Sequence, residues 1–218
     1  MKTQTSLSQL ALSIPGATAV LRKHRLDFCC GGKVSLEEAC RERNIDVNTV
    51  LADLEALEVT QENKDWANKP LNEIADHVAE FYHKRLRNMF PELIWLADKV
   101  EKVHADHPQT PKGLSAHLQE MHSDMLDHMT KEEQILFPLI KNGQGTNAYM
   151  PIKVMQEDHV SHGAGLKKLR QLAFDFIAPE GACGTWRSLY KGLDLLEMEL
   201  MDHIHLENNI LFMRALQG

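Results

Sequence analysis

The sequence lacks the features that mark exported, membrane-spanning and disulfide-stapled proteins. No charged start leads into an apolar segment, so we expect no secretory leader. No apolar run approaches the roughly 20 residues that cross a bilayer, so we expect no membrane partner. Four cysteines form no CxxC pair and no evident disulfide framework: Cys29, Cys30, Cys40 and Cys183. These absences favour a cytoplasmic protein in a reducing compartment.

An excess of basic residues is also missing. The chain has 24 lysines and arginines against 31 aspartates and glutamates, a formal net charge of -7. This disfavours a nucleic-acid partner, because phosphate backbones are bound by basic patches. The 218 residues with 43% hydrophobic content are enough for a well-filled core and a smaller additional unit.

What the sequence does contain is a set of apolar stripes interrupted by histidine and glutamate. Within residues 185–216, apolar residues recur in steps of three and four, which keeps them on one helix face. Only His203 and Glu207 break that stripe. An earlier stripe is broken in the same way by His128 and Glu132. A carboxylate carried into a core is costly unless a strong partner such as a metal ion meets it.

Two further stripes carry histidine without a carboxylate. One covers residues 79–100 and contains His83, and the other covers residues 152–176 and contains His159 and His162. Four long amphipathic segments predict an all-α four-helix bundle. Connections of roughly ten residues favour an up-down-up-down arrangement.

The bundle is expected over residues 71–218, after a linker over 61–70 and a small helical domain over 1–60 that holds the vicinal cysteines. Pro91 should kink or split the first bundle helix. The third bundle helix is predicted to end near residue 177. A unit of about 60 residues builds only a small core, so we expect it to pack on the bundle or on a second copy in a homodimer.

Nitrogen and oxygen donors on the stripes suit iron, manganese or zinc, and no thiolate lies among them. Six candidate ligands exceed what one tetrahedral zinc takes, and two carboxylates can bridge a metal pair. We therefore predict a centre of two iron ions with an oxide or hydroxide bridge. Glu133 is expected to be solvated, since it points about a third of a turn away from its neighbour. The candidate metal ligands are His83, His128, Glu132, His159, His203 and Glu207.

In this order, the six residues resemble the ligand pattern of the hemerythrin-like bundle. Together with the segment Asp-Phe-Cys-Cys-Gly-Gly-Lys at residues 27–33, the chain resembles the di-iron proteins that repair iron–sulfur clusters, the RIC family. The resemblance covers essentially the whole chain. It implies that Glu132 and Glu207 bridge two irons and that each iron takes two of the four histidines.

One position departs from the oxygen-carrying hemerythrins, which have His-x3-His on the third helix. Here Gly163 stands four residues after His159, so one nitrogen is missing and a coordination position can stay open. This favours chemistry on, or exchange of, the irons over oxygen storage. His162 lies on the same stripe and remains open as a ligand or as a neighbour of one. Gly163 and Gly165 suggest that something needs room there.

Cys29 and Cys30 allow two interpretations. They form either a structural turn or a thiol pair that accepts electrons, iron or a cluster fragment. A disulfide between sequence neighbours is strained, so we expect no permanent bridge. No catalytic residue is assigned beyond this thiol role.

The resemblance implies repair of iron–sulfur clusters damaged by oxidative or nitrosative stress, with damaged iron–sulfur proteins as partners and iron supplied from a labile His/Glu centre. Three alternatives remain open at this point. The first is a hemerythrin-like module that binds or senses oxygen or nitric oxide. The second is a nitric oxide-reducing di-iron enzyme, and the third is a purely structural metal bundle.

Overall fold

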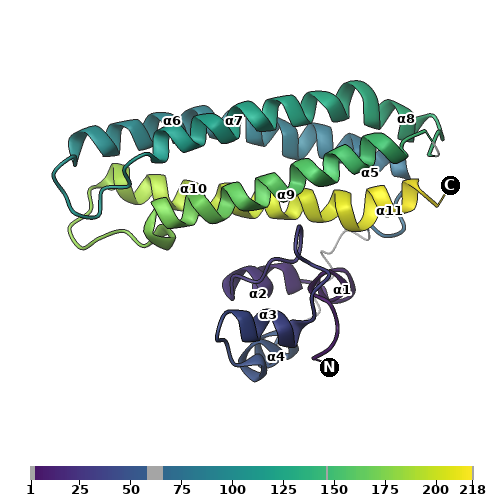
Figure 1. Cartoon of the computed structure of the whole chain (residues 1–218), viewed down its shortest axis with the longest axis horizontal. Coiled ribbons are helices and arrows are strands. Elements are labelled where there is room, and N and C mark those ends of the chain that lie inside the picture. The colour runs from purple at the N-terminus through teal and green to yellow at the C-terminus, as the bar shows by residue number, and fades with distance from the viewer. Residues whose placement is uncertain (1–2, 58–65, 146, 218) are drawn as a thin grey trace.

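The chain is all-α in a computed structural model that describes residues 3–57, 66–145 and 147–217. Four long helical rods lie side by side, and a group of short helices lies against one side of them (Figure 1). The prediction of an up-down-up-down four-helix bundle preceded by a small helical unit is confirmed.

The small unit consists of four short helices whose starts are set by capping side chains. Ser6 accepts a hydrogen bond from the backbone N–H of Gln9, and Ser35 does the same for Glu38. Such caps satisfy N–H groups that have no partner within the helix. The helices are α1 (Leu7–Ser13), α2 (Ala17–Lys23), α3 (Leu36–Glu42) and α4 (Val47–Glu55).

Each bundle rod is built from several elements, and three of the rods contain a π-helical segment among the described residues. The first rod comprises α5 (Leu71–His77), π segment η1 (Val78–His83) and α6 (Lys84–Val103). The second comprises α7 (Leu114–Lys131), π segment η2 (Glu132–Leu136) and α8 (Phe137–Lys141). The third is α9 (Tyr149–Leu172), followed by the short η3 (Phe174–Phe176). The fourth comprises α10 (Gly184–Leu206), π segment η4 (Glu207–Leu211) and α11 (Phe212–Ala215).

Two helix expectations are corrected. Of the two outcomes expected at Pro91, a split does not occur, since helix α6 runs through this residue, and its neighbours Phe90 and Leu93 are buried in the bundle. The third bundle helix ends at Leu172 rather than near residue 177. The three residues of η3 all have positive φ, from 50° to 63°, and a right-handed helix cannot continue through that conformation.

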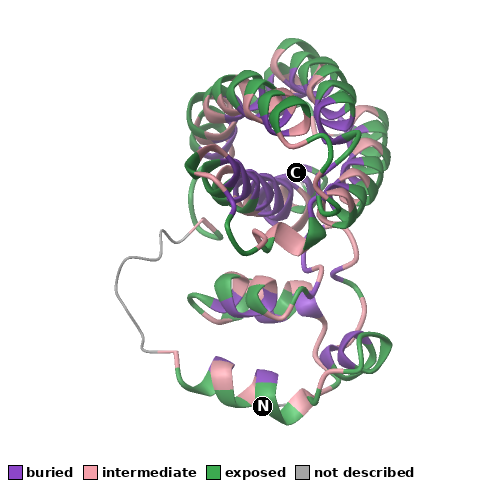
Figure 2. Cartoon of the chain, turned by 90° about the vertical axis from the view of Figure 1, so that its left-hand side faces the viewer, coloured by how far each residue is buried: buried purple, intermediate pink, exposed green. Residues whose placement is uncertain are grey.

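The bundle core is divided into two apolar clusters. One contains residues such as Leu86 and Met125 and extends into the small unit, and the other contains Val78 and Leu136. The interior between the rods is lined by buried residues (Figure 2). The predicted ligand positions lie between the two clusters along the rods, so a polar layer separates two hydrophobic ones.

The small unit packs directly on the bundle, as expected from its size. Its Phe28 is fully buried and meets the ring of His205 edge-on at 5.4 Å. An ion pair of 2.9 Å joins Arg25 to Asp175 of η3. Residues 61–65 of the predicted linker lie outside the described residues, so the domain boundaries at residues 60 and 70 stay a prediction.

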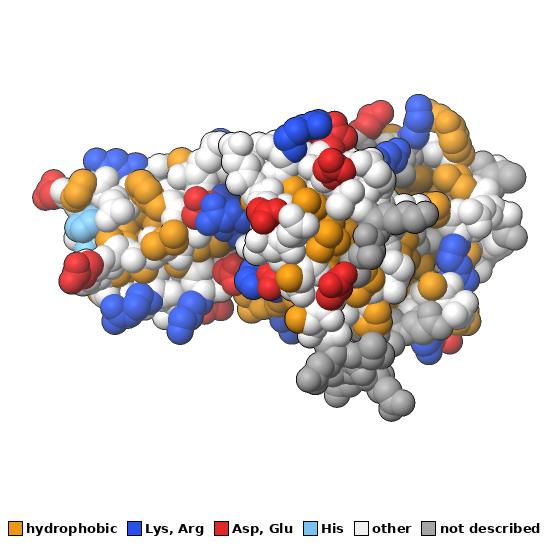
Figure 3. Space-filling view, turned by 90° about the horizontal axis from the view of Figure 1, so that it is seen from below, with side chains coloured by type: hydrophobic (Ala, Val, Ile, Leu, Met, Phe, Trp, Pro, Cys, Tyr) orange, Lys and Arg blue, Asp and Glu red, His pale blue; other side chains and the backbone are white. Residues whose placement is uncertain are grey.

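The surface on the side of the small unit carries acidic and basic side chains interspersed with apolar ones (Figure 3). Among the described residues, no helix combines the length and the apolar character that crossing a membrane requires.

Gly32 provides a test of the turn that holds the vicinal cysteines. A Cβ at this position would lie 2.4 Å from the carbonyl oxygen of Phe28, so the backbone must shift to admit it. Gly32→Ala is expected to lower the free energy of unfolding by about 1–3 kcal/mol. Gly184→Ala serves as the control, since its Cβ would meet nothing within 4 Å. Equal unfolding midpoints for the two variants in thermal denaturation would contradict this account.

Candidate metal centre

Three of the six predicted ligands lie at the ends of the π-helical segments. His83 closes η1, Glu132 opens η2 and Glu207 opens η4. A π turn is wider than an α turn and changes the face on which the following side chains lie. Such turns occur most often at functional sites. The local distortion of three rods is thus concentrated at the level of the candidate centre.

The structure brings all six predicted ligands together in two overlapping groups. Both glutamates belong to both groups, whereas each group has its own pair of histidines. Within each group, one ligand atom per residue lies within 4.8 Å of the others. The groups are His83, Glu132, His203 and Glu207, and His128, Glu132, His159 and Glu207.

Each carboxylate faces two imidazole nitrogens at short range. For Glu132, Oε2 lies 3.3 Å from Nε2 of both His83 and His128. For Glu207, Oε2 lies 3.2 Å from Nε2 of His159, and Oε1 lies 3.1 Å from Nε2 of His203. All six side chains converge on one level of the bundle.

Most of the polar atoms at this level are buried without hydrogen-bond partners among the described residues; the exceptions are the Nε2 atoms of His128 and His159, which face each other at 3.2 Å. Glu132 and Glu207 are fully buried, and neither oxygen of either carboxylate accepts a hydrogen bond. The Nε2 atoms of His83 and His203 are equally unpaired. Buried polar groups in native proteins nearly always have partners, so this set fits cations placed between the nitrogens and the oxygens.

The pKa values of the two carboxyl groups are shifted in opposite directions. Burial, and then the charge of Glu207, raises the pKa of Glu132 well above its usual value. Burial also opposes ionisation of Glu207, but His203 and His159 hold the pKa of Glu207 well below its usual value. Burial, followed by the nearby His203, lowers the pKa of His83 to about 4. The imidazole of His83 is therefore neutral and able to ligate a metal at neutral pH.

Glu133 is only partly exposed, and its carboxylate is engaged by other side chains, contrary to the expectation from an ideal helix. Its Oε1 lies 2.7 Å from Nδ1 of His83, and its carboxylate is held by two hydrogen bonds from Arg87 of 2.9 and 3.0 Å. A carboxylate on the far nitrogen of a ligating histidine fixes the ring and its tautomer. Glu133 thus orients His83.

Two further side chains hold histidine rings from behind, and the sequence reading did not identify them. Asp158 lies 3.3 Å from Nδ1 of His128 and also pairs with Lys131. The side-chain oxygen of Asn208 lies 2.9 Å from Nδ1 of His159. Both are sequence neighbours of a ligand, and this adjacency is the signal that could have found them.

His203 is held differently, because its Nδ1 has no hydrogen-bond partner among the described residues. Instead, the ring of Tyr82 stacks on it at 5.5 Å and 17°. His162 is buried and meets the ring of His128 edge-on at 4.9 Å, but it belongs to neither ligand group. The geometry therefore places His162 beside the centre rather than in it.

The vicinal cysteines lie against the third rod. Sγ of Cys30 donates to the carbonyl oxygen of His159 at 3.1 Å, and a Cβ on Gly163 would lie 3.2 Å from that sulfur. The room left by Gly163 is thus filled by Cys30. Cys29 and Cys30 are free thiols with their sulfurs 3.4 Å apart. The hydrogen bond with Cys30, together with burial, raises the pKa of Cys29 well above its usual value.

A bundle that carries a shared His/Glu site of this kind defines the class of hemerythrin-like proteins. The family model described as the hemerythrin HHE cation binding domain matches residues 75–215. A second family model, a domain of unknown function (DUF542, ScdA_N), matches residues 3–58.

The chain is also similar over its whole length to proteins named iron-sulfur cluster repair protein YtfE. Those of Shigella boydii serotype 4 (strain Sb227) and Escherichia coli O8 (strain IAI1) are each 48% identical over 212 residues, which is 97% of this chain and 96% of the relative. The chain therefore belongs to the family of iron–sulfur cluster repair proteins with a hemerythrin-like domain.

The Glu132→Gln variant tests whether Glu132 binds a metal ion or only supports the fold. The amide keeps the volume but removes a charge from the centre, so metal affinity should fall by about tenfold or more. The metal-free protein should lose no stability, because a buried carboxylate without its cation is itself destabilising. Metal analysis and urea unfolding measure the two effects, with the exposed Glu157→Gln as control. Unchanged metal content in Glu132→Gln would reject the ligand role.

The metal-free protein should lose stability as pH falls from about 6.5 towards 4. Burial lowers the pKa of both His83 and His162 to about 4. Between pH 6.5 and 4, these histidines are therefore protonated in the unfolded chain but not in the folded one. Each such histidine contributes at most about 1.4 kcal/mol per pH unit. Urea unfolding at several pH values checks this, and His162→Asn should give a shallower dependence. The same slope in both proteins would show that His162 is not responsible.

Proposed function

We propose that this chain repairs iron–sulfur clusters damaged by oxidative or nitrosative stress, by supplying iron from the His/Glu centre. The observation that carries the proposal is the pair of ligand groups that share both glutamates. The relatives named as iron–sulfur cluster repair proteins share nearly half of their residues with this chain over its full length.

The donor set suits iron that must leave again. All six side chains in the two groups offer nitrogen or oxygen, whereas iron–sulfur proteins hold their clusters by thiolates. We assign two irons to the centre, each with two histidines, bridged by Glu132 and Glu207 and by an oxide or hydroxide. Two divalent ions would offset the burial of both carboxylates, and the iron is the cargo that the damaged client receives.

Reversible oxygen storage is a poorer fit. The third rod offers no imidazole at position 163, and Cys30 fills the adjoining space. A small ligand such as nitric oxide remains part of the proposal, since the centre has fewer nitrogens than an oxygen carrier. We further propose that the protein works in the cytoplasm, where its free cysteines stay reduced. A homodimer stays a prediction.

The test is recovery of a damaged client. A [4Fe–4S] enzyme inactivated by nitric oxide or peroxide is incubated with the iron-loaded protein, and its activity is followed. Recovery should exceed that with the same amount of free ferrous iron. The iron-loaded Glu157→Gln variant should match the wild-type protein, because Glu157 is exposed and outside the ligand groups.

The Glu132→Gln protein, loaded under the same conditions, should give little recovery because it holds less iron. Labelling the protein with ⁵⁷Fe and recording the Mössbauer spectrum of the re-isolated client shows where the iron went. Recovery no better than with free iron, or a repaired client without label, would reject iron supply.

A further inference from the structure

A second group of metal-binding side chains lies outside the His/Glu centre, on the turn of the small unit that faces the bundle. Asp27, Cys29 and Cys30 each offer one donor atom, and these atoms lie within 4.8 Å of one another. Sγ of Cys29 is 3.4 Å from Sγ of Cys30 and 3.4 Å from Oδ1 of Asp27. Two sulfurs and a carboxylate form a softer donor set than the one inside the bundle.

The separation of the sulfurs suits a single ion. Two thiolates bound tetrahedrally at about 2.3 Å lie about 3.8 Å apart. The observed 3.4 Å needs only a small rotation of one side chain. Both thiols are free, so no bond between the sulfurs has to be broken first.

The carboxylate is held in place before any ion binds. Oδ1 of Asp27 accepts the backbone N–H groups of Cys29 at 3.2 Å and Cys30 at 2.9 Å. Oδ2 forms no hydrogen bond with any described residue. A Cβ on Gly31 would lie 3.1 Å from Oδ2, so the glycine leaves this oxygen uncovered. The turn thus orients one donor oxygen and keeps it accessible.

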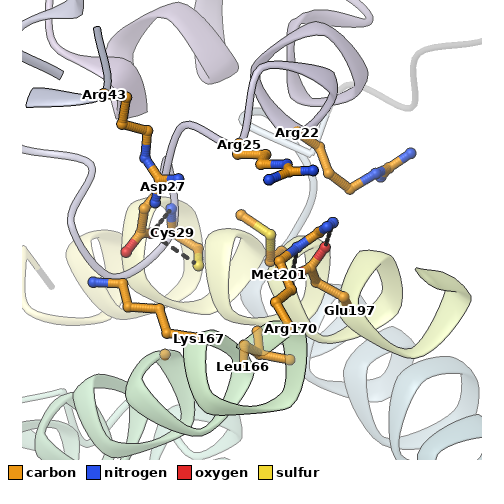
Figure 4. Close-up of a pocket in the computed structure, with 11 residues that line it drawn as sticks. Arg22, Arg25, Asp27, Cys29, Arg43, Leu166, Lys167, Arg170, Glu197 and Met201 are labelled. Carbon is orange, nitrogen blue, oxygen red and sulfur yellow. Dashed lines mark hydrogen bonds and ion pairs between the residues drawn. The ribbon is translucent and has the colours of Figure 1, made fainter. Parts of the chain in front are cut away.

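A cavity of about 60 Å³ opens beside the three residues, between the small unit and α9. Asp27 and Cys29 line it from one side, and Leu166 and Lys167 of α9 line it from the other (Figure 4). Gly163 also lines it. A space of this size admits water or a small anion. Such a molecule can complete the coordination of an ion held by three protein ligands.

The charges around the cavity favour an anionic metal complex. Two thiolates and one carboxylate carry three negative charges, of which a divalent ion cancels two. Arg22, Arg43 and Lys167 also line the cavity. None of these three forms an ion pair with a described residue, so their charges remain available to offset the remainder. Arg25 and Arg170 line it too, but each is already engaged by an acidic residue.

We propose that Asp27, Cys29 and Cys30 form a second metal site, which binds a divalent ion such as ferrous iron through two thiolates and one carboxylate. Each thiol releases its proton to solvent on binding, so one ion replaces two protons. The site deepens the proposed function, and only its assignment to iron rests on that function. In this proposal, the thiolate site binds the iron after it leaves the His/Glu centre and before it reaches the client.

Two contacts join this thiolate site to the His/Glu centre. The carbonyl oxygen of His159 accepts the thiol of Cys30, while the imidazole of the same residue faces Glu207. The side-chain oxygen of Asn208 accepts a hydrogen bond from Nδ1 of His159 at 2.9 Å, and its amide nitrogen donates to the carbonyl oxygen of Cys29 at 3.3 Å. The thiolate site is therefore in direct contact with one of the ligand residues of the bundle.

Cobalt(II) is the probe, because thiolate ligation gives it intense charge-transfer absorption that nitrogen and oxygen ligands do not. The iron-loaded, reduced full-length protein is titrated with Co²⁺ without oxygen, and bound cobalt and released protons are counted. One added equivalent should produce the absorption and release two protons. Cys29→Ser, Cys30→Ser and Asp27→Asn should each weaken binding by about tenfold or more.

Cys183→Ser is the matched control and should keep the absorption, since Cys183 lies away from the turn. Circular dichroism and iron content establish that each variant is folded and loaded, and Asp27→Asn leaves both sulfurs in place. Absence of the absorption in the wild-type protein, or its persistence in the Cys29→Ser/Cys30→Ser protein, overturns this inference. Client repair without cobalt binding rejects the thiolate site alone, whereas cobalt binding without client repair rejects the proposed function alone.

Discussion

Two carboxylates lie in the middle of a hydrophobic bundle, and the rest of the architecture is arranged around that fact. Glu132 and Glu207 are fully buried, and the groups that face them are imidazoles. Without cations, this layer would destabilise the fold, because the two carboxylates would repel each other and would have lost their hydration. With cations, the same residues form a compact charged layer between two apolar clusters. The bundle accordingly needs helices on all four sides of the layer.

The orientation of the imidazoles depends on residues that the apolar stripes do not reveal. Glu133, Asp158 and Asn208 each hold the far nitrogen of one histidine. Each is directly next to a candidate ligand in the chain, so these three segments carry both a group that faces the centre and a group that holds a histidine of another rod. His203 is the exception, since a stacked tyrosine takes the place of a hydrogen bond.

The sequence predicted the rods and all six converging side chains, because steps of three and four identify one helix face wherever the helix is regular. It failed where the helix is not regular. A spacing of 100° per residue predicts that Glu133 faces solvent, but Glu133 lies in the π segment η2, where that spacing does not hold. The early end of α9 was equally invisible, because none of the left-handed residues of η3 is a glycine.

The spacing of apolar residues also could not predict where the small unit packs on the bundle. The glycine at position 163 indicated a need for space, but only the fold shows that Cys30 occupies it. Contacts between segments more than a hundred residues apart depend on how the rods pack, and local spacing carries no information on that. The cysteine turn and the bundle are therefore packed against each other although they are separate in sequence.

The three π segments set the angle at which each rod continues beyond the ligand layer. Removing one residue from η4 would leave a continuous helix but rotate everything on one side of the cut by about 100° relative to the other. The buried side chains of Ile210 and Leu211 would then face different neighbours, although the rod would remain helical. A single-residue deletion in η4 would therefore turn the buried Phe212 and Ala215 away from their apolar cluster, and the packing next to the ligand layer would be lost.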